Sequence, residues 1–581
     1  MDAHRSTNTE TAMRNAEIVM APERLGAMHQ NRISFVRSLI RKMAKQEWHV
    51  TQHEWQLCPQ GYGHVIYRLE TPAHVYHLVV FCDEIADEER NDRVIAEKWD
   101  VTFALVYGDV DSALLEQLRA NVPLQEAGRN PNKVLVLARA NKSVRVFEHI
   151  VSHLSQGIQP DPKELADVGY ILRTTAVYGN GKFGIADFKL LENNQDFSQS
   201  FSAQMCAVYL LREFSLDWVH YLAKQYGGDK AISLHRGLQR YLGVGNATGL
   251  GMAPYLINHP CIVDQWMTTR ERAISEVLAM PCEQSEYLAL DALLNKGIRH
   301  LQQVITINKH QANLNIVALE HLVNLRKQLN MLMLQSPNWK AVVEQSQAMS
   351  LEAQEILISC LMELYPEVVD PFEEQMNCDE ALSLASGKKV SDLIALLEAK
   401  YRWAIDMDFT LPENNYWFWY RSQDKEEPRL GIRGEEVGEE RELPLDIGRQ
   451  VYRFYHALRT YTESRSDLAD ASMAEFLLHE PKHRAIARRV WTLGNKAMGD
   501  IQMNVLRQDA LPMHLLRCKL AIFGATKFDP RSDRWVRVTF FQGSPLLDEI
   551  HDQNYQDNWI FPLLPSDESL IQQSTFGGAT Q

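Results

Sequence analysis

The sequence predicts an α+β protein that is predominantly α-helical, with an N-terminal mixed α/β part and a larger helical body. The prediction depends on how apolar residues are spaced along the chain. Up to about residue 190, short apolar runs alternate with helical segments, which is typical of an α/β or α+β unit. Beyond about residue 200, apolar residues recur almost everywhere at the 3.6-residue period of a helix. We therefore expect the architecture to change between these two points.

Four regions follow from this division. We expect 1–48 to be a flexible arm and an amphipathic helix, and 49–190 to be a mixed α/β domain. Residues 191–402 are predicted to form a helical domain. Residues 403–581 are predicted to form a helical C-terminal region with a charged loop at 424–444 and a late strand.

The first predicted helix lies between Ala21 and about Trp48, after an arm that shows no hydrophobic period. Its apolar residues step by three or four, and its opposite face is basic. A basic helix face is usually solvated, so we expect this one to lie in water, with a nucleic-acid contact as the alternative. The basic residues are Arg32, Arg37, Arg41 and Lys45.

Strands are predicted only in the next stretch and near the end. Segments 64–70 and 74–81 form a hairpin signal, with Pro72 in the connection. The other predicted strands are 101–107, 133–138 and 535–541, and helices are expected near 84–99, 111–120 and 143–156.

The helical body is predicted from long segments with a 3.6-residue period. They are 205–214, 286–305, 314–333, 351–365 and 390–401, followed by helices from Leu445 to about Leu520. The final ten residues, QQSTFGGATQ, are expected to be disordered.

Charge and cysteine usage restrict the class of function. The formal net charge is −15, which opposes general nucleic-acid binding because that role needs an excess of Lys and Arg. The eight cysteines include no C-x-x-C pair, and no segment has the roughly 18 consecutive apolar residues of a membrane span. We expect a soluble cytoplasmic protein with no membrane partner, and oligomerisation stays open.

Histidine-containing motifs do not predict a metal site. His479, Glu480 and His483 form a literal H-E-x-x-H, but Pro481 lies between the histidines and breaks the helix that a zinc site requires. We expect one helix to end near His479 and the next to begin at Pro481. His149 and His153 have i, i+4 spacing without a visible third ligand, and His74 and His77 are expected to point to opposite faces of a strand.

Other candidate groups have ordinary structural interpretations. Cys261 lies between His259 and Asp264, but neighbours in sequence need not converge in space, so a buried thiol is expected. The aromatic run 414–421 is expected to be a buried strand or core plug, with a cover over a ligand or a partner-binding surface as the alternative.

Two glycine-rich segments are the main candidates for a functional site. Gly179, Gly181 and Gly184 punctuate RTTAVYGNGKFG, and four glycines punctuate YLGVGNATGLGMAP. Glycine permits close backbone approach, so exposed N–H groups can bind an anion. No βαβ unit follows the first segment and neither segment is a Walker A loop, so dinucleotide and P-loop sites are excluded.

We therefore predict that polar side chains in these segments bind a small anionic substrate, with glycines that shape the loops. The predicted substrate-binding residues are Arg173, Thr174, Asn180, Lys182, Asn246 and Thr248, and the loop-shaping residues are Gly179, Gly181 and Gly245. No catalytic residue or cofactor is identified, and no metal is expected.

A third polar segment, RANKSVR at 139–145, lies between a predicted strand and a predicted helix. We expect Ser143 or Asn141 simply to cap that helix, with exposed charges beside it. An anion bound by the helix dipole and the nearby cations is the alternative interpretation.

The sequence favours an enzyme that acts on a carboxylate- or phosphate-bearing metabolite, without establishing a reaction class. The size of the chain and the polar glycine segments support this expectation. The alternative is a non-catalytic helical protein that binds other proteins.

Overall fold

The computed structural model describes residues 13–565 apart from several short segments. Those outside the described set are 86–98, 122–132, 175, 177–193, 250–258, 335–337, 377–380, 412–416, 423–427, 432–441, 445–446, 464–470, 501–504, 507–511, 532–534 and 553–554. The fold is α+β and mostly helical, as predicted.

The chain divides into two compact units, and neither is continuous in sequence. One unit contains 1–28, 250–280 and 374–519. The other contains 29–249, 281–373 and 520–581. We call them the helical unit and the sheet unit.

The sheet unit is built on nine strands in the order β1-β2-β3-β4-β5-β6-β7-β13-β12. All neighbouring pairs are antiparallel except β6 and β7, which are parallel. The strands are β1 (His49–Leu57), β2 (Gly63–Glu70), β3 (Val75–Cys82), β4 (Val101–Tyr107), β5 (Val134–Lys142), β6 (Tyr170–Thr174), β7 (Gly243–Gly249), β12 (Ala525–Pro530) and β13 (Trp535–Phe540).

The strands predicted at 64–70, 74–81, 101–107, 133–138 and 535–541 are confirmed. The expected hairpin is β2–β3, paired from Gly63↔Cys82 to Glu70↔Val75. The late strand is β13, which joins the same sheet between β7 and β12. The sequence did not predict β1, β7 or β12.

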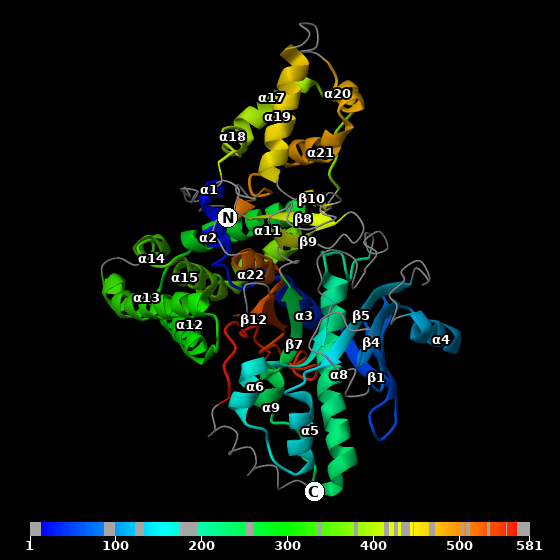
Figure 1. Cartoon of the computed structure of the whole chain (residues 1–581). Coiled ribbons are helices and arrows are strands. Elements are labelled where there is room, and N and C mark those ends of the chain that lie inside the picture. The colour runs from blue at the N-terminus through cyan, green and yellow to red at the C-terminus, as the bar shows by residue number, and fades with distance from the viewer. Residues whose placement is uncertain are drawn as a thin grey trace, which may run out of the picture. The chain divides into compact units, whose positions relative to one another are not determined.

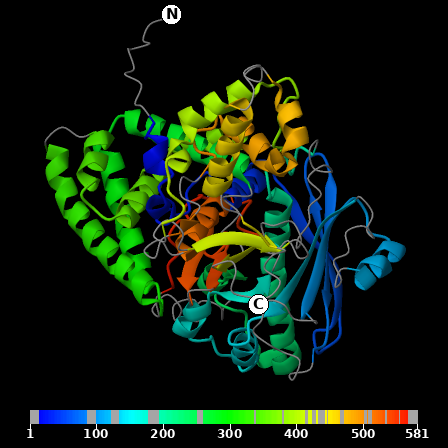
Figure 2. The same ribbon diagram turned by 45° about the horizontal axis from the view of Figure 1, so that its top comes forward.

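The long helix α8 (Ser202–Gly227) is the central support of the sheet. Residues 202–216, its first four turns, are all buried, which is typical of a helix segment enclosed on every side, while its C-terminal end reaches the surface. It lies along β4–β7 and packs against α5 (Phe147–Ser155) and α3 (Phe35–Lys45) (Figure 2). Gly228, with φ of 56°, ends it in a conformation that suits glycine.

The short helix α6 (Pro162–Val168) leads directly into β6. Asp161 caps its first turn, Pro162 occupies the first helical position, and Gly169 ends it with φ of 85°. Because Gly169 precedes Tyr170, the C-terminal carbonyls of α6 lie at the start of β6.

The remaining helices of the sheet unit include α4 (Ser112–Asn121), whose Leu114 and Leu118 pack on an apolar cluster from β2–β5. Four helices from 284–364 pack together (Figure 1). They are α12 (Gln284–Gln303), α13 (Lys309–Leu334), α14 (Trp339–Ser346) and α15 (Leu351–Leu364), and the other short helices are α9 (Arg236–Tyr241), α16 (Pro366–Val369) and a 3-10 helix (Asp370–Gln375). The helices predicted at 205–214, 286–305, 314–333 and 351–365 are therefore confirmed, although α12 ends two residues and α15 one residue before the predicted boundary.

The helical unit contains α11 (Pro260–Ala279) and a cluster formed by α17–α21 (Figure 1). The cluster consists of α17 (Val390–Lys400), α18 (Arg402–Ile405), α19 (Ile447–Glu463), α20 (Met473–His479) and α21 (Arg484–Leu493). The N-terminal helices of the helical unit are α1 (Ala16–Val19) and α2 (Pro22–Leu25). Helix α22 (Pro512–Phe523) begins in the helical unit and ends in the sheet unit.

The prediction that 424–444 is a charged loop is wrong in part. Two strands within it, β9 (Pro428–Gly431) and β10 (Glu442–Pro444), pair with β8 (Trp417–Ser422). β11 (Val505–Leu506) pairs with the other part of β8. Backbone pairing with β8 outweighs the weak local preference of this charged sequence for a strand.

The structure confirms the helix junction predicted at Pro481 and shows the state of the cysteines. α20 ends at His479 and α21 begins at Arg484 after a 3-10 turn at Pro481–His483, so the helix junction is confirmed. The seven cysteines among the described residues are free, and five are buried. None of the described helices combines the length and apolarity needed to span a bilayer. The C-terminal QQSTFGGATQ lies outside the described residues.

Candidate functional site

The first glycine-rich segment begins at the carboxyl end of β6. Arg173 is half-buried in this strand. Thr174 is buried, and its hydroxyl donates to the Arg139 carbonyl over 2.8 Å and accepts from the Ala176 N–H over 3.1 Å. The Thr174 hydroxyl thus holds the chain where it leaves the sheet. Predicted residues Gly179, Asn180, Gly181 and Lys182 lie outside the described residues.

The second segment is not a loop between residues 243 and 249, where we expected one; it is strand β7. Gly245 lies under the ring of Tyr170, and a Cβ atom at this position would come within 2.5 Å of ring carbons. Asn246 is fully buried and pairs with Val538 on β13. Thr248 pairs with Val536, and its side chain is outside the described set. Glycine here permits close packing in a sheet instead of shaping a loop.

The two segments leave the sheet side by side. β6 and β7 are parallel neighbours, and Arg173 pairs with Gly245. Residues 175–193 and 250–258 therefore follow the carboxyl ends of adjacent strands. Ligands of open α/β sheets bind at such carboxyl ends.

Arg173 shares one face of the sheet with several other polar residues. Direct partners in a ladder lie on the same face, and so do residues two apart on one strand. Arg173 pairs with Asn141 on β5 and with Gly245 on β7, which pairs with Thr539 on β13. The charged members of this face are Arg139, Arg173, Lys527, Asp529 and Arg537. We call these five residues the cationic face.

The cations on β12 and β13 meet the C-terminus of α6. Lys527 Nζ donates to the carbonyls of Ala166 and Asp167 over 2.8 and 2.9 Å, and Arg537 Nη1 donates to the Asp167 carbonyl over 2.9 Å. The Asp167 carboxylate binds Arg145 and Arg531 at 2.6 and 3.2 Å. Cations at a helix C-terminus are favourable because the helix dipole is negative there.

Burial disfavours the charged forms of the residues on the cationic face. It lowers the pKa of Arg139 and Arg537, and it lowers the pKa of Lys527 to about 8. Burial also raises the pKa of Asp529 despite its three cationic neighbours. These shifts mean that the surrounding described groups do not fully compensate the desolvated cations.

Several buried polar atoms beside these charges make no hydrogen bond to any described residue. Thr539 is fully buried, and its hydroxyl lacks such a bond. The same holds for Nε of Arg139 and Nε of Arg537, whereas Asp529 Oδ2 lies 2.8 Å from Arg531 Nε. These three unbonded groups are donors, and buried donors of this kind are the groups that an anion satisfies.

The predicted third segment contributes to this face in an unexpected way. Arg139 and Asn141 lie inside β5, and Arg145 follows it. The helix cap is Val146, so the prediction that Ser143 or Asn141 caps α5 is wrong. Asn141 Oδ1 accepts instead from the Asp100 N–H over 3.1 Å, because β5 extends further than its apolar residues indicate.

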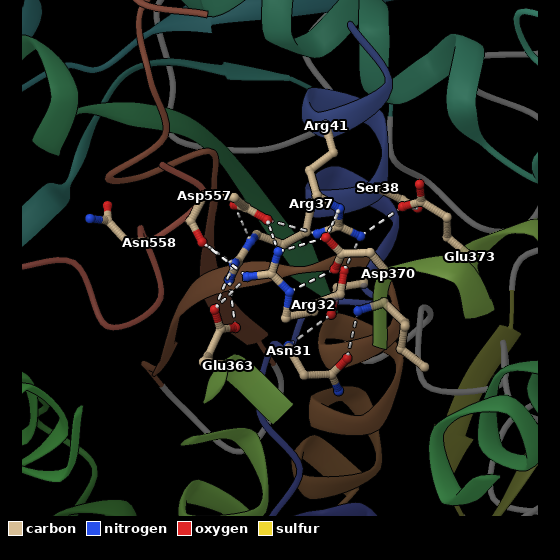
Figure 3. A network of polar contacts seen from close by, with 12 residues as sticks. Asn31, Arg32, Arg37, Ser38, Arg41, Glu363, Asp370, Glu373, Asp557 and Asn558 are labelled. Carbon is tan, nitrogen blue, oxygen red and sulfur yellow. Dashed lines mark hydrogen bonds and ion pairs between the residues drawn. The ribbon is translucent and has the colours of Figure 1, made fainter. Parts of the chain in front are cut away.

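A second polar centre lies at α3, and it contradicts the expected solvated helix face. Arg32, Arg37 and Arg41 are buried, with 5%, 0% and 4% exposure. Figure 3 shows their side chains converging on carboxylates from distant parts of the chain. We call the arginines and these carboxylates, Glu363, Asp370, Glu373 and Asp557, the arginine network.

Charges in the arginine network are matched. Arg37 Nε donates to Asp557 over 2.8 Å and its Nη2 donates to Glu363 over 2.9 Å. Burial lowers the pKa of Arg37, but the charges of Asp557 and Glu363 outweigh that effect and raise it above the ordinary value. With half-buried Lys296 nearby, and with mostly exposed Lys45 left out, four described cations face four carboxylates. A compensated cluster of this kind ties segments together and leaves no net charge for a ligand.

Sequence reasoning also missed a histidine–carboxylate pair. His74 Nδ1 lies 2.8 Å from Asp196 Oδ2, which also accepts from the hydroxyls of Thr71 and Tyr76 over 2.9 Å. Asp196 follows the first glycine-rich segment, so this contact fixes the point at which the chain returns to the sheet. No sequence signal indicates a contact between residues 122 positions apart.

The other candidate groups have structural surroundings. His153 Nδ1 lies 2.8 Å from the His149 carbonyl, and His149 Nε2 lies 3.2 Å from Glu164. Within the described ranges, no group of three or more His, Cys, Asp or Glu side chains is arranged to hold a metal ion. Cys261 is buried as expected, and nearby Asp264 accepts from the Met498 N–H over 2.9 Å.

We expect Gly245→Ala to lower the free energy of unfolding by about 1–3 kcal/mol, because the new methyl group overlaps the Tyr170 ring. Urea denaturation measures this change. In a Tyr170→Ala background the same substitution should have little effect. Gly297→Ala is the control, since its Cβ would lie 3.6 Å from its nearest neighbours. Equal losses with and without Tyr170 would contradict the packing explanation.

Comparison with known proteins identifies no relative. A scan against known protein families, a search of curated proteins and a search of solved structures each found no match. Any functional conclusion about this chain therefore depends on its own residues.

Proposed function

We propose that the protein is an enzyme that acts on a small anionic metabolite, bearing carboxylate or phosphate, held on the cationic face. The observation that carries the proposal is the register of β6 with its neighbours. It puts Arg173 on the same face as Arg139, Lys527 and Arg537. Among the described residues, four cations then share that face with one carboxylate, Asp529.

Electrostatics supports an anionic ligand here. An anion placed against buried cations recovers the interaction that burial removes, and charge-assisted hydrogen bonds are the strongest available. Arg139 and Arg537, whose pKa values burial lowers, would be stabilised in their charged forms by such a ligand. The arginines of the arginine network do not need an anionic ligand in this way, because the carboxylates around them already raise their pKa values.

The position of the face supports a ligand site as well. Both glycine-rich segments follow the carboxyl ends of β6 and β7, where polar loops commonly bind substrates. In this proposal Arg173 binds the anionic group through a bidentate contact. Backbone donors near Gly179 and Gly181, together with Asn180 and Lys182, remain predicted contributors from the first segment.

We expect Arg173→Ala to weaken binding of an anionic ligand by about 1.5–3 kcal/mol, the range for hydrogen bonds to charged groups. The ligand is chosen from a panel of phosphates, carboxylates and sugar phosphates by the rise in melting temperature that binding causes. Isothermal titration then compares wild type with the variant.

Lys224→Ala is the matched control, because Lys224 is 62% exposed and pairs with Asp229 on the surface. It should bind like wild type. Wild-type affinity in Arg173→Ala would remove this residue from the site. A panel in which no anion stabilises the protein would contradict the proposed function.

A second candidate function, binding of another protein through the helical body, is favoured by exposed apolar side chains on α12 and α13. Leu288, Ile316 and Met331 are 62%, 54% and 61% exposed. Exposed apolar groups of this size are typical of interaction surfaces when they are contiguous. Copurification of a partner with wild type, and its loss in an Ile316→Lys variant, would support this function.

A further inference from the structure

The cationic face carries more positive charge than one simple anion neutralises. Arg139 and the charged residues around α6 are all buried or partly buried apart from Arg145. Among the described residues of this face and of the adjoining C-terminus of α6, leaving out Arg173, five cations lie with two carboxylates, an excess of three positive charges. The cations are Arg139, Arg145, Lys527, Arg531 and Arg537, and the carboxylates are Asp167 and Asp529.

This excess charge is divided between two centres. The Arg139 guanidinium lies 5.3 Å from the centre of the Trp99 ring, next to β4. The Arg537 guanidinium is held by the Asp167 carbonyl and lies 3.8 Å from Asp529. Each arginine is thus fixed by its own neighbours.

The two centres are far apart on the sheet. β5 carries Arg139 and β13 carries Arg537, with β6 and β7 between them. Neighbouring strands are about 4.8 Å apart, so the two strands are separated by about 14 Å. Arg173 on β6 lies between the centres. One phosphate cannot contact both fixed guanidinium groups.

We infer that the ligand of the cationic face is an extended polyanion with at least two phosphate-type groups, which bridges the centre at Arg139 and the centre at Arg537. This inference rests on the proposed function and specifies its substrate class. A phosphate group carries about two negative charges near neutral pH, so two groups match the excess better than one carboxylate does.

Linear polyphosphates of one to five phosphates test the inference, because only the longer chains can reach both centres. We expect affinity, measured by isothermal titration at fixed ionic strength, to rise at least 100-fold from orthophosphate to pentaphosphate. In Arg139→Gln, which removes one of the two centres, this gain should fall at least tenfold.

Lys388→Gln is the matched control. Lys388 also lies over an aromatic ring, 4.3 Å from the centre of Trp491, but it belongs to the helical unit and not to the nine-stranded sheet. It should bind pentaphosphate like wild type. Equal losses in both variants would show general attraction to basic residues and would overturn the inference.

The results also separate this inference from the proposed function. If orthophosphate or a monocarboxylate binds as tightly as pentaphosphate, the site takes a single anion; the inference is then wrong and the proposed function stands. If none of these anions binds, both are wrong. Circular dichroism of each variant checks that the substitution leaves the fold intact.

Discussion

Replacing Arg37 with Met should lower the free energy of unfolding by about 3–5 kcal/mol, the range for breaking a buried ion pair by removing one partner. Arg37 is fully buried and bonds to both Asp557 and Glu363. The substitution leaves two buried carboxylates with less compensation, although Arg32 and Arg41 remain nearby. Urea denaturation followed by circular dichroism measures the loss.

Lys45→Ala is the control for this prediction. Lys45 belongs to the same helix, is 62% exposed and lies 3.8 Å from Glu373. Exposed ion pairs contribute about 0–1 kcal/mol, so this variant should be nearly as stable as wild type. An Arg37→Met protein as stable as Lys45→Ala would show that the arginine network does not support the fold.

The second large effect is loss of stability in acid. Burial alone would raise the pKa of Asp557, but Arg37, Arg41 and Arg32 hold it well below its ordinary value of 3.8. A carboxyl group whose pKa is lower in the folded state stabilises the protein fully above its unfolded pKa. That stability is lost as the pH falls from about 5 through the unfolded value and toward the folded one. Denaturation at a series of pH values measures the slope.

Asp557→Asn should therefore be less stable than wild type at pH 7, and its stability should fall less steeply below about pH 5. Glu213→Gln is an informative comparison because burial raises the pKa of Glu213 to about 7 from 4.5. Its contribution has the opposite sign and is lost as the pH rises from 4.5 through 7. This variant should change the slope in that window and leave the acid limb intact. Parallel curves for Asp557→Asn and wild type below pH 5 would contradict the assignment.

Much of the fold follows from local patterns. The β2–β3 hairpin and β4 are apolar runs bounded by turn residues, and such runs are strands in most surroundings. The helices between α12 and α17 have a regular apolar stripe. The H-E-x-x-H motif does not form one helix because proline inside a helix removes a backbone hydrogen bond and clashes with the preceding turn, so α20 ends before Pro481.

Strand β7 shows why other elements could not be predicted. GVGNATG lacks the β-branched and aromatic residues that favour strands. It becomes a strand because β6 and β13 pair with it on both sides and the Tyr170 ring fills the space above Gly245. Those partners are 73 residues before and about 290 residues after it in the chain. Only the folded chain supplies them.

Likewise, one residue of the candidate site could be predicted from local sequence, and the others could not. Arg173 was predicted from its own segment, because a cation beside a glycine-rich sequence is a local signal. Arg537 and Lys527, more than 350 residues away, reach the same face only through the register of β7 with β13 and β12.

By itself, the sequence determined the fold class, the predicted strands and helices, and a cation at one candidate site. Whether a charged side chain is exposed or buried was decided by the tertiary structure. Arg37 and Lys45 occur on one basic helix with the same local pattern, yet one is buried among carboxylates and the other is mostly in water. Local periodicity reports which residues share a face of a helix. What covers that face depends on long-range packing, which brings Glu363 and Asp557 to α3 across more than 300 residues of chain.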